Sequence, residues 1–343
     1  MSTTAIASTT DHLSPLWVVT SYYNPAGYQR RLQNFTLFRQ FLDVPLLVVE
    51  LSSGADFALD KSCDGDIVLQ LVGEDRLWQK ERLINIGVKA LPAHVKYVAW
   101  IDCDVIFLDP DWSQQTLEKL QADNVILQLF NRAYHVDKHF IESTELQKEC
   151  SDVDKLRKDS VLIESSVVPV WQTADQNSDF DPNKHHARGA SIDNLTDSDE
   201  YQPAFGIAWA APRRFFEQVG LYDGSIMGGG DDFILAGYNK TVSALSQRFV
   251  HSASHSHHAQ VWGNKFADCR NSYSISYLNG GLIHLWHGIF SNRQYLERQQ
   301  LLTNFDPYRD LQTADSGAWQ WRNPQGEIAQ NVAEYFYQRK EDG

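Results

Sequence analysis

The sequence predicts an α/β fold in which helices flank a largely parallel β-sheet. Short apolar runs typical of buried strands alternate with segments of helical periodicity through the first 130 residues. Turn-rich segments separate the two kinds of element, and no internal repeat or heptad pattern interrupts them. In such a sheet the crossovers are right-handed, and ligands bind beyond the carboxyl ends of the strands.

Each element follows from a local pattern. Runs such as LWVVT and VPLLVVEL combine apolar and β-branched residues over strand length, whereas Leu32, Phe35 and Phe38 recur at helical spacing. Proline near the start and glycine at the end bound the last predicted helix. In chain order the predicted elements are strand 16–20, helix 28–42, strand 44–51, strand 67–71, helix 74–91, the strand within 97–107, helix 112–120, strand 125–129, strand 205–211 and helix 212–220.

Composition excludes several classes of protein. Of the 343 residues, 43% are hydrophobic and 22% charged, as in ordinary globular proteins, and the net charge of −14 argues against a nucleic-acid partner. The four cysteines are widely spaced, which favours reduced thiols over a zinc ribbon or a disulfide framework. We find no transmembrane segment and no signal-peptide pattern, so we expect a cytoplasmic protein, or one peripheral at a membrane.

The stretch YVAWIDCDVIF, residues 97–107, is the most informative part of the chain. Its apolar run delivers Asp102 and Asp104 to the end of a buried strand, where residues two apart point the same way. Two carboxylates that share a site raise each other's pKa unless a cation neutralises them, and Mg²⁺ or Mn²⁺ suits such oxygen ligands. Taken alone, the pattern fits a strand that ends in an acidic turn equally well.

Two further segments contain candidate ligand-binding residues on, or at the start of, a predicted helix. Lys80, Arg82 and Asn85 lie about one helix before the acidic pair, where they could meet a diphosphate, although a solvated helix face explains this segment alone more simply. In MGGGDDFILAGY, glycines precede Asp231 and Asp232 at the start of a helical pattern. A carboxylate there stays ionised and suits a general base, and the alternative is a helix cap after a flexible turn.

Histidines form the last group. His284 and His287 lie three residues apart after a double glycine, and one or both could complete a metal site begun by Asp104. The alternative for each is a core or loop histidine. The run HSASHSHH at 251–258 holds four of the twelve histidines, and its serines favour an exposed loop or helix start over a zinc site.

In their order along the chain, these blocks resemble the metal-dependent glycosyltransferases of the GT-A fold, nearest to the β-1,4-galactosyltransferase and chondroitin-polymerase type. Proteins of that type carry a helix ending LLN-x-G, an Asp-x-Asp strand, Gly-Gly-Glu-Asp-Asp and a late metal-binding histidine. The counterparts here are Leu83–Gly87, Asp102–Asp104, Gly229–Asp232 and His284–His287. The likeness spans residues 16–305, although only these blocks are specific, and it implies a mixed, mostly parallel sheet flanked by helices.

The resemblance implies Mn²⁺ or Mg²⁺ as cofactor and a role for each block. Asp104 would be the direct metal ligand with His287, His284 would stand in place of another ligand, and Asp102 would assist the ion or hold the donor ribose. The implied catalytic carboxylates are Asp231, as acceptor base, and Asp232. Further donor contacts are expected from Thr20, Tyr22, Lys80, Arg82 and Asn85, and acceptor contacts from Trp209, Gly229, Gly230 and Trp286.

The implied reaction moves a sugar from a nucleotide-diphosphate sugar, with a UDP-sugar as the expected donor, to a carbohydrate or glycan acceptor. We expect inversion because the GGxDD block resembles inverting enzymes, and retention stays open because GT-A enzymes of both outcomes share the other blocks. Two departures leave the donor sugar open. Gly230 stands where the family has glutamate, and His284 stands where the galactosyltransferases have methionine.

Two other functions fit parts of the pattern. A sugar-1-phosphate nucleotidyltransferase would need a glycine-rich basic loop after the first strand, where this chain has SYYNPAGYQRR. A non-catalytic carbohydrate-binding protein would use exposed tryptophans as stacking platforms, but it would leave the acidic and histidine blocks unexplained. The candidate platforms are Trp171, Trp262, Trp286, Trp319 and Trp321.

We expect one catalytic domain at 15–309, with a nucleotide-binding half at 15–130 and an acceptor and metal half at 131–309. The segment 173–201 lacks apolar periodicity and is predicted to be a long loop, a candidate lid. Residues 1–14 are predicted to be a disordered tail, and residues 310–343 a C-terminal tail that is partly helical.

Overall fold

A computed structural model describes residues 13–54, 56–140, 152–160, 162–169, 172, 204–294 and 297–343. The predicted loop at 173–201 and Trp171 lie outside the described residues, as do residues 1–12 of the predicted N-terminal tail.

A mixed seven-stranded sheet forms the centre of the fold. Its strands are β1 (Leu16–Tyr23), β2 (Leu46–Ser52), β3 (Ile67–Val72), β4 (Tyr97–Ile101), β6 (Val125–Gln128), β9 (Ala208–Pro212) and β10 (Ser274–Tyr277), in the order β10-β6-β9-β4-β1-β2-β3. Only β9 runs antiparallel to its neighbours in this sheet, since the β10–β6, β4–β1, β1–β2 and β2–β3 pairs are parallel. The predicted α/β fold with a mixed, mostly parallel sheet is therefore confirmed.

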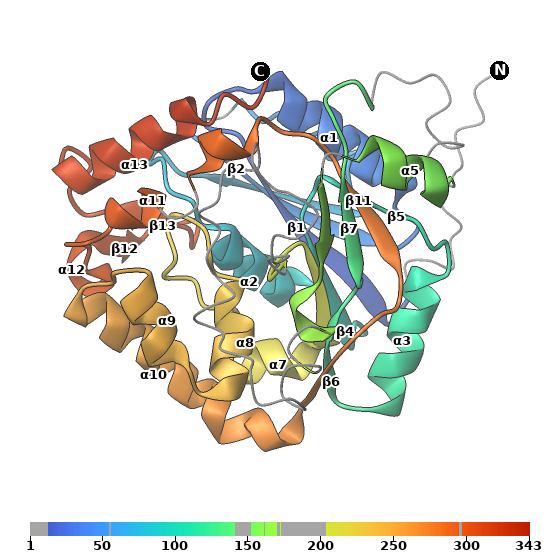
Figure 1. Cartoon of the computed structure of the whole chain (residues 1–343). Coiled ribbons are helices and arrows are strands. Elements are labelled where there is room, and N and C mark those ends of the chain that lie inside the picture. Colours follow the sequence, from blue (N-terminus) through green and yellow to red (C-terminus); the bar gives the residue numbers. More distant parts are fainter. Residues whose placement is uncertain are drawn as a thin grey trace.

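Helices cover both faces of this sheet (Figure 1). Side chains alternate along β1, so Leu16 and Val18 belong to one core whereas Trp17 and Val19 belong to the other. The first core includes residues of α1 (Gln29–Phe41) and α3 (Trp112–Ala122). The second includes residues of α2 (Lys80–Ala90), α7 (Arg213–Gln218), α8 (Asp232–Asn239), α9 (Val242–Arg248) and α10 (Ala253–Cys269).

A second sheet carries the late histidines to the acidic pair. It consists of β5 (Val105–Phe107), β11 (Gly281–His284), β7 (Arg132–His135) and β8 (Leu162–Ser165), in the order β5-β11-β7-β8, with α5 (Val153–Asp159) before β8. β11 pairs antiparallel with β5, and the register places His284 opposite Val105, the residue that follows Asp104. The backbone N–H of Leu285 donates to the carbonyl of Asp104 at 2.8 Å. This pairing brings two distant segments of the chain together.

The segment after residue 294 adds to the second core. It forms α11 (Glu297–Gln300), α12 (Pro307–Asp310), the β12 (Leu311–Thr313) and β13 (Trp319–Trp321) hairpin, and α13 (Glu327–Gln338). The short helix predicted in the C-terminal tail is α13, which buries Val332, Tyr335 and Phe336 in that core. Beyond α13 the chain returns to α1, where Glu341 pairs with Arg31 at 2.5 Å. Residues 310–343 therefore pack against the rest of the fold.

Two predicted elements differ from the structure. The acidic pair follows a buried strand, β4, as predicted, but residues 102–104 form a turn before β5, so strand alternation does not set the directions of the two carboxylates. The helix predicted from residue 74 begins only at Lys80. The N–H of Leu77 donates to the Tyr23 hydroxyl and that of Trp78 to the Ile226 carbonyl, so tertiary partners replace the first helical turn.

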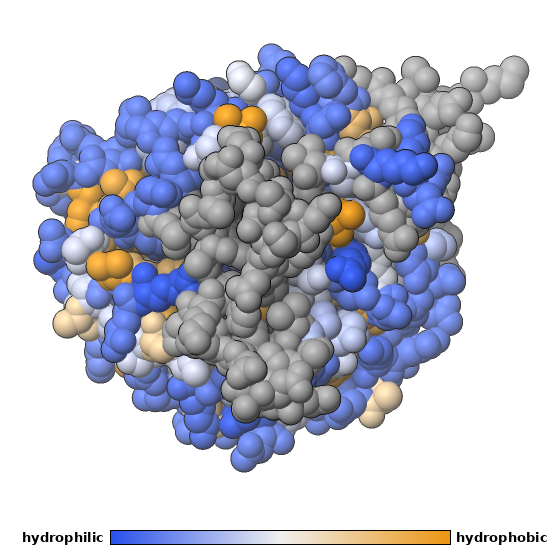
Figure 2. Space-filling model, in the orientation of Figure 1, coloured by the Kyte–Doolittle hydropathy of each residue, from blue (hydrophilic) through white to orange (hydrophobic). Residues whose placement is uncertain are grey.

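Hydrophilic side chains cover most of the described surface seen in Figure 2, with a few separate hydrophobic patches. Within the described residues, no helix is both long enough and apolar enough to cross a membrane.

Candidate active site

A cavity of about 240 Å³ lies at the carboxyl ends of β1, β4 and β11. Ser21 and Tyr22 of β1, Asp102 after β4 and His284 at the end of β11 all line it. Open α/β sheets bind ligands at this edge, where several strands deliver side chains to one place. The cavity thus lies where the sequence placed the acidic pair.

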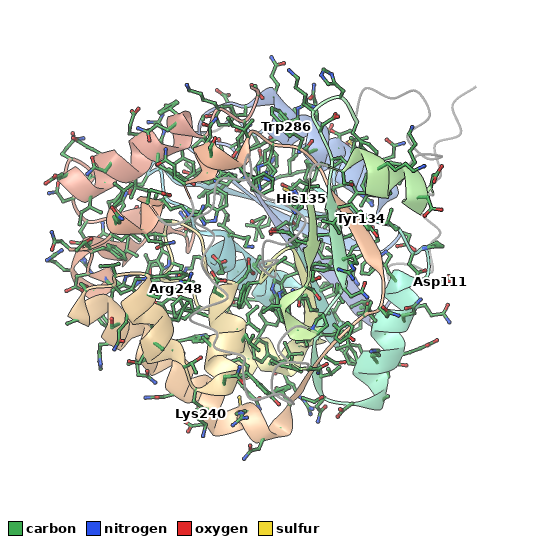
Figure 3. All side chains as sticks on the ribbon, viewed as in Figure 1. Asp111, Tyr134, His135, Lys240, Arg248 and Trp286 are labelled. Atoms are coloured by element: carbon green, nitrogen blue, oxygen red, sulfur yellow. The ribbon has the colours of Figure 1, made fainter. Side chains whose placement is uncertain are left out.

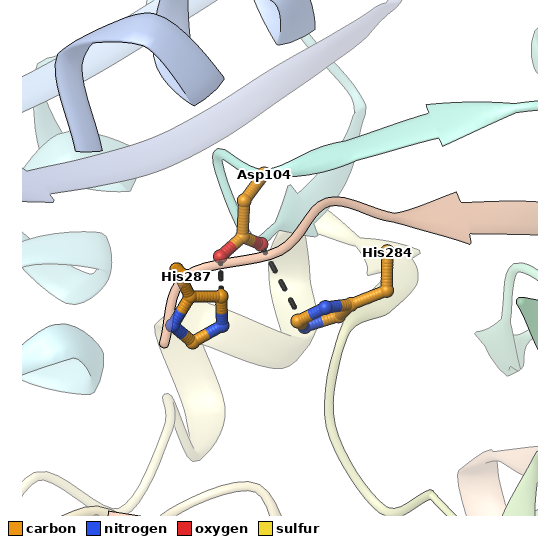
Figure 4. Close-up of side chains that lie close together, drawn as sticks. All are labelled: Asp104, His284 and His287. Carbon is orange, nitrogen blue, oxygen red and sulfur yellow. Dashed lines mark ion pairs between the residues drawn. The ribbon is translucent and has the colours of Figure 1, made fainter. Parts of the chain in front are cut away.

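Three side chains in this cavity form a set that could hold a metal ion (Figure 4). The candidate ligand atoms of Asp104, His284 and His287 all lie within 4.8 Å of one another. Nε2 of His287 is 3.3 Å from Oδ2 of Asp104, and Nε2 of His284 is 3.9 Å from Oδ1. The predicted ligands therefore come together, whereas the predicted fourth member, Asp102, pairs with Lys80 instead.

The electrostatics of the set fit a divalent ion. Oδ1 of Asp104 is buried with no hydrogen-bond partner among the described residues. Burial, and next the nearby Asp102, raise the pKa of Asp104 to about 7, a sign of uncompensated charge. Burial, and next Arg293, hold the pKa of His287 well below its ordinary value, so this imidazole is neutral and can act as a ligand.

The side-chain carboxylate of Glu341, close to the C-terminus, lies near Nδ1 of His287. Oε1 of Glu341 is 3.9 Å from Nδ1 of His287, and Glu341 also pairs with Arg31 and Arg339. Burial alone would raise the pKa of Glu341, but the two guanidinium groups outweigh it and hold the pKa at about 2. Glu341 is therefore ionised, and it is placed to orient the His287 ring from outside the metal set.

A second support lies behind His284. His135 of β7, labelled in Figure 3, has its ring centroid 4.6 Å from that of His284. Nε2 of His135 lies 2.8 Å from Oε2 of Glu164 on β8, and both side chains are buried and line the cavity. The contact with Glu164 holds the His135 ring in place, and the His284 ring packs against it.

Lys80 joins the acidic pair to the predicted base. Its ammonium donates to Oδ1 of Asp102 at 3.0 Å and to Oδ2 of Asp231. Burial would lower the pKa of Lys80, but Asp102 and Asp231 outweigh it and raise that pKa well above its ordinary value. Burial raises the pKa of Asp231 to about 6, although Lys80 opposes this rise. Asp231 is therefore ionised near neutral pH and poised to accept a proton.

The glycine turn positions Asp231 at the start of α8. Gly228 and Gly229 have φ of 79° and 85°, a conformation that favours glycine, and Gly229 lines the cavity. A Cβ on Gly206 would lie 2.5 Å from Oδ2 of Asp231, so the carboxylate packs directly against that backbone. Asp232 also lines the cavity.

Two predicted donor contacts have structural partners instead. Arg82 donates to the Gly317 carbonyl at 2.8 Å and to Asp223 at 3.1 Å. The side chain of Asn85 donates to the Leu221 carbonyl and accepts from the Leu221 N–H, each at 2.9 Å. Neither residue is among those that line the cavity, because both lie on the part of α2 that packs on later segments. The donor-binding role of these two residues therefore stays a prediction, and their observed contacts are structural.

Four other predicted contacts, Gly230 among them, are also absent from the cavity lining. Thr20 is buried and donates from Oγ1 to the Ile101 carbonyl at 2.6 Å, which ties β1 to β4. Trp209 is 1% exposed and donates to the Phe205 carbonyl, so it lies in the core. Trp286 packs against the Arg30 guanidinium near α1 (Figure 3). Among the predicted Tyr and Trp contacts within the described residues, Tyr22 lines the cavity.

The candidate stacking tryptophans and the histidine run are largely internal. Trp262 and Trp321 are buried, which removes them as open platforms for a sugar. The histidine run does start a helix, α10, but His251 and His255 are not exposed, and their rings stack with centroids 3.5 Å apart. His255 lies 3.1 Å from the Gly224 carbonyl, so packing and a backbone contact explain this histidine.

Several residues that line the cavity were not singled out from the sequence, among them Arg31, Glu81, His135, Glu164 and Glu341. A signal existed for Glu81. It precedes Ile84 by three residues and Val88 by seven, so helical spacing puts a carboxylate on the apolar face of α2. No local pattern marks the others, because long-range packing brings them to the cavity.

No family model matches the sequence, and no curated protein matches it. The solved structures similar to this chain include glucosyl-3-phosphoglycerate synthase from Mycobacterium tuberculosis in complex with Mn²⁺, UDP and phosphoglyceric acid, at 12% identity and a TM-score of 0.40 over 89% of this chain and 84% of that one. The catalytic domain of Drosophila β1,4-galactosyltransferase 7 in complex with xylobiose is similar at 11% identity and a TM-score of 0.33, over 88% of this chain and 90% of that one.

Proposed function

We propose that this chain is a metal-dependent glycosyltransferase of the GT-A fold, which moves a sugar from a nucleotide-diphosphate sugar to a carbohydrate acceptor. The observation that carries the proposal is the convergence of two groups in one cavity. One group is the set of Asp104, His284 and His287, and the other is Asp231, which Lys80 links to Asp102. The three-residue set could bind a metal ion that in turn binds the diphosphate of the donor. Asp231 could take the proton from an acceptor hydroxyl.

Asp104, His284 and His287 would hold the ion, and this set fits Mn²⁺ better than Mg²⁺. Mg²⁺ prefers oxygen ligands in octahedral geometry, whereas two of these three ligands are imidazoles. A bound divalent ion would neutralise the charge that builds up on the diphosphate leaving group.

Charged side chains of both signs line the cavity. Among the described lining residues, five are Lys or Arg and seven are Asp or Glu; the basic ones are Arg31, Lys80, Arg293, Arg298 and Arg339. The guanidinium and ammonium groups could bind a diphosphate, and a metal ion would offset the carboxylates. Asp102 would accept hydrogen bonds from the donor ribose while Lys80 holds it in place. We propose a UDP-sugar as the donor.

Asp231 would take the proton from the acceptor hydroxyl as that oxygen attacks the anomeric carbon. The Lys80 ammonium keeps the carboxylate aimed and ionised, and the packing against Gly206 fixes it from the other side. Attack from the face opposite the leaving diphosphate inverts the anomeric configuration. We therefore propose an inverting reaction, to be checked by NMR of the anomeric proton in the first-formed product.

One experiment tests the proposal directly. The protein is incubated with Mn²⁺ and a panel of UDP-, GDP- and CMP-sugars, and release of the nucleotide is measured with and without saccharide acceptors. Asp104→Ala should abolish the release. Asp111→Ala is the matched control, because Asp111 is exposed, lies in the same segment and is not among the cavity-lining residues (Figure 3). If the wild-type protein neither binds nor cleaves any donor, the proposed function is wrong.

The same preparation separates the two competing functions. A nucleotidyltransferase would release pyrophosphate from a nucleoside triphosphate in the presence of a sugar 1-phosphate. A carbohydrate-binding protein would bind saccharides without turning over any donor. Either result, with no release of nucleotide from the sugar panel, would replace the transferase assignment.

A further inference from the structure

Glu81 is a buried carboxylate that none of the roles above uses. It lies on α2 next to Lys80, is 1% exposed and lines the cavity. Neither of its carboxylate oxygens meets a hydrogen-bond donor of another described residue. A buried polar group without partners costs stability, so its presence in this cavity needs an explanation.

Glu81 occupies the space that a side chain at position 230 would fill. A Cβ on Gly230 would lie 2.7 Å from Cγ of Glu81, and closer still to its Cδ and Oε1. Gly228 and Gly229 have positive φ, but Gly230 does not, so its backbone would accept a side chain. A side chain at 230 would therefore have to displace the Glu81 carboxyl group.

The surroundings of Glu81 raise its pKa, which suits hydrogen bonding to a neutral hydroxyl group. Burial raises the pKa of Glu81 to about 8, with Lys80 opposing the rise and Asp231 adding to it. A carboxyl group near that pKa can both donate a hydrogen bond to a hydroxyl oxygen and accept one from a hydroxyl proton. Because its electrostatic partners are Lys80 and Asp231, the group lies beside the proposed base and not among the metal ligands.

We propose that Glu81 is an acceptor-binding residue that binds a sugar hydroxyl next to the one deprotonated by Asp231, and so selects which hydroxyl reacts. The proposal rests on the proposed glycosyltransferase function. The acceptor class it names is a saccharide with neighbouring hydroxyl groups, one for Asp231 and one for Glu81. The unpartnered oxygens of Glu81 gain their hydrogen bonds only when this acceptor is bound.

The first test measures KM for donor and acceptor in Glu81→Ala and Glu81→Gln. The acceptors are the methyl glycosides of glucose, galactose, N-acetylglucosamine and xylose. Glu81→Ala should raise the acceptor KM by about tenfold, the usual size of one lost hydrogen bond to a substrate, and far more than it changes the donor KM. Glu81→Gln should keep most of the acceptor affinity, since an amide also donates and accepts. Glu118→Ala, an exposed glutamate of α3, is the matched control and should change neither KM.

Deoxy analogues of the best acceptor locate the contact. Removing the hydroxyl that binds Glu81 should raise the wild-type KM by a similar factor, and should have no further effect in Glu81→Ala. If no deoxy analogue shows this coupling, or if Glu81→Ala leaves the acceptor KM unchanged, the inference is overturned while the proposed function stands. If the wild type turns over no donor, the proposed function fails as well.

Moving the carboxyl group from position 81 to position 230 tests whether the two side chains would occupy the same volume. Gly230→Glu alone should lower the thermal unfolding temperature, because two side chains would compete for one volume. The double variant Glu81→Ala with Gly230→Glu should fold like the wild type and recover part of the acceptor affinity lost in Glu81→Ala. A double variant no better than Gly230→Glu in unfolding temperature would contradict the shared space, and one that folds but shows no recovery would contradict the binding role.

Discussion

Oδ2 of Asp104 lies 3.3 Å from Nε2 of His287. Asp104 directly precedes β5 and His287 follows β11, so the two residues come from distant parts of the chain. The antiparallel pairing of β11 with β5 sets this distance, since the register of a strand pair fixes which residues face each other. His284 ends β11, whereas Asp104 lies in the turn just before β5 and His287 lies three residues after β11. The paired strands therefore support the proposed metal site, and a rigid support of this kind favours a preformed set of ligands.

Replacing either histidine of the set should weaken metal binding. We expect His287→Ala and His284→Ala each to raise the Kd for Mn²⁺ by at least about tenfold, because each removes an imidazole ligand from a three-residue set. His257→Ala, an exposed histidine of α10, is the control and should leave the Kd unchanged. Isothermal titration with MnCl₂ measures all three. An unchanged Kd in both cavity variants would remove the metal site.

Replacing the proposed base should separate donor binding from transfer. We expect Asp231→Asn to keep the donor Kd within a few-fold and to lower kcat for transfer by about 100-fold or more, because the amide cannot take a proton. Asp232→Asn, the neighbouring carboxylate that also lines the cavity, is the informative comparison. If Asp232→Asn loses transfer and Asp231→Asn does not, the base is Asp232.

The pH profile should report the pKa of Asp231. Burial raises this pKa to about 6, and the base acts in its ionised form, so kcat/KM should rise through about pH 6 and level off above it. Lys80 lowers the pKa of Asp231, so Lys80→Met should move the rising limb to higher pH, whereas Lys80→Arg, which keeps the charge, should move it less. Lys89→Met, an exposed lysine at the end of α2, is the control. A limb that stays in place in Lys80→Met would contradict the assignment.

The sequence predicted the strands of the central sheet except β10, and it showed the acidic, glycine and histidine blocks, because each of these has a local signature. Asp102 and Asp104 follow a fully apolar run, and His284 follows a double glycine. No local pattern shows which polar residues of a helix will face the cavity. Lys80 and Arg82 are two residues apart on α2, but Lys80 faces Asp231 whereas Arg82 faces Asp223. Only tertiary packing decides between them.

The contribution of the C-terminus could not be predicted for a related reason. Glu341 reaches the cavity because α13 packs its apolar face on the second core and returns the chain to α1. The helix itself was readable from Val332, Tyr335 and Phe336, but its docking position depends on surfaces far away in the sequence. Long-range ion pairs of this kind leave no pattern in a single sequence.

Asn85 should prove structural and not donor-binding. Its side chain makes two hydrogen bonds of 2.9 Å to the backbone of Leu221 and so ties α2 to the segment after α7. We expect Asn85→Ala to lower the free energy of unfolding by about 1–3 kcal/mol, the cost of leaving buried backbone groups unpaired, and to leave the donor KM unchanged. Urea denaturation and donor kinetics measure the two effects. A higher donor KM with unchanged stability would restore the role predicted from the sequence.

Glu341 should make stability depend on pH in the acidic range. Burial would raise its pKa, but Arg31 and Arg339 hold it at about 2, below the ordinary value of 4.5. A carboxylate with a lowered pKa contributes stability that is fully present above about pH 4.5 and is lost as the pH falls toward 2. At pH 7, Glu341→Gln should cost about 3–5 kcal/mol, because it leaves two guanidinium groups without their carboxylate.

Urea denaturation of the wild type and Glu341→Gln at several pH values between 7 and 3 measures this dependence. The difference in unfolding free energy between the two proteins should be constant from pH 7 to about pH 5 and should shrink below pH 4.5, as the wild-type carboxylate takes up its proton. Glu334→Gln, an exposed glutamate on α13, is the control and should follow the wild type at every pH. If the curves of the wild type and Glu341→Gln run parallel down to pH 3, Glu341 does not titrate with a lowered pKa. The two arginines would then be held by other partners, and the support that Glu341 gives to the His287 ring would be electrostatically unimportant.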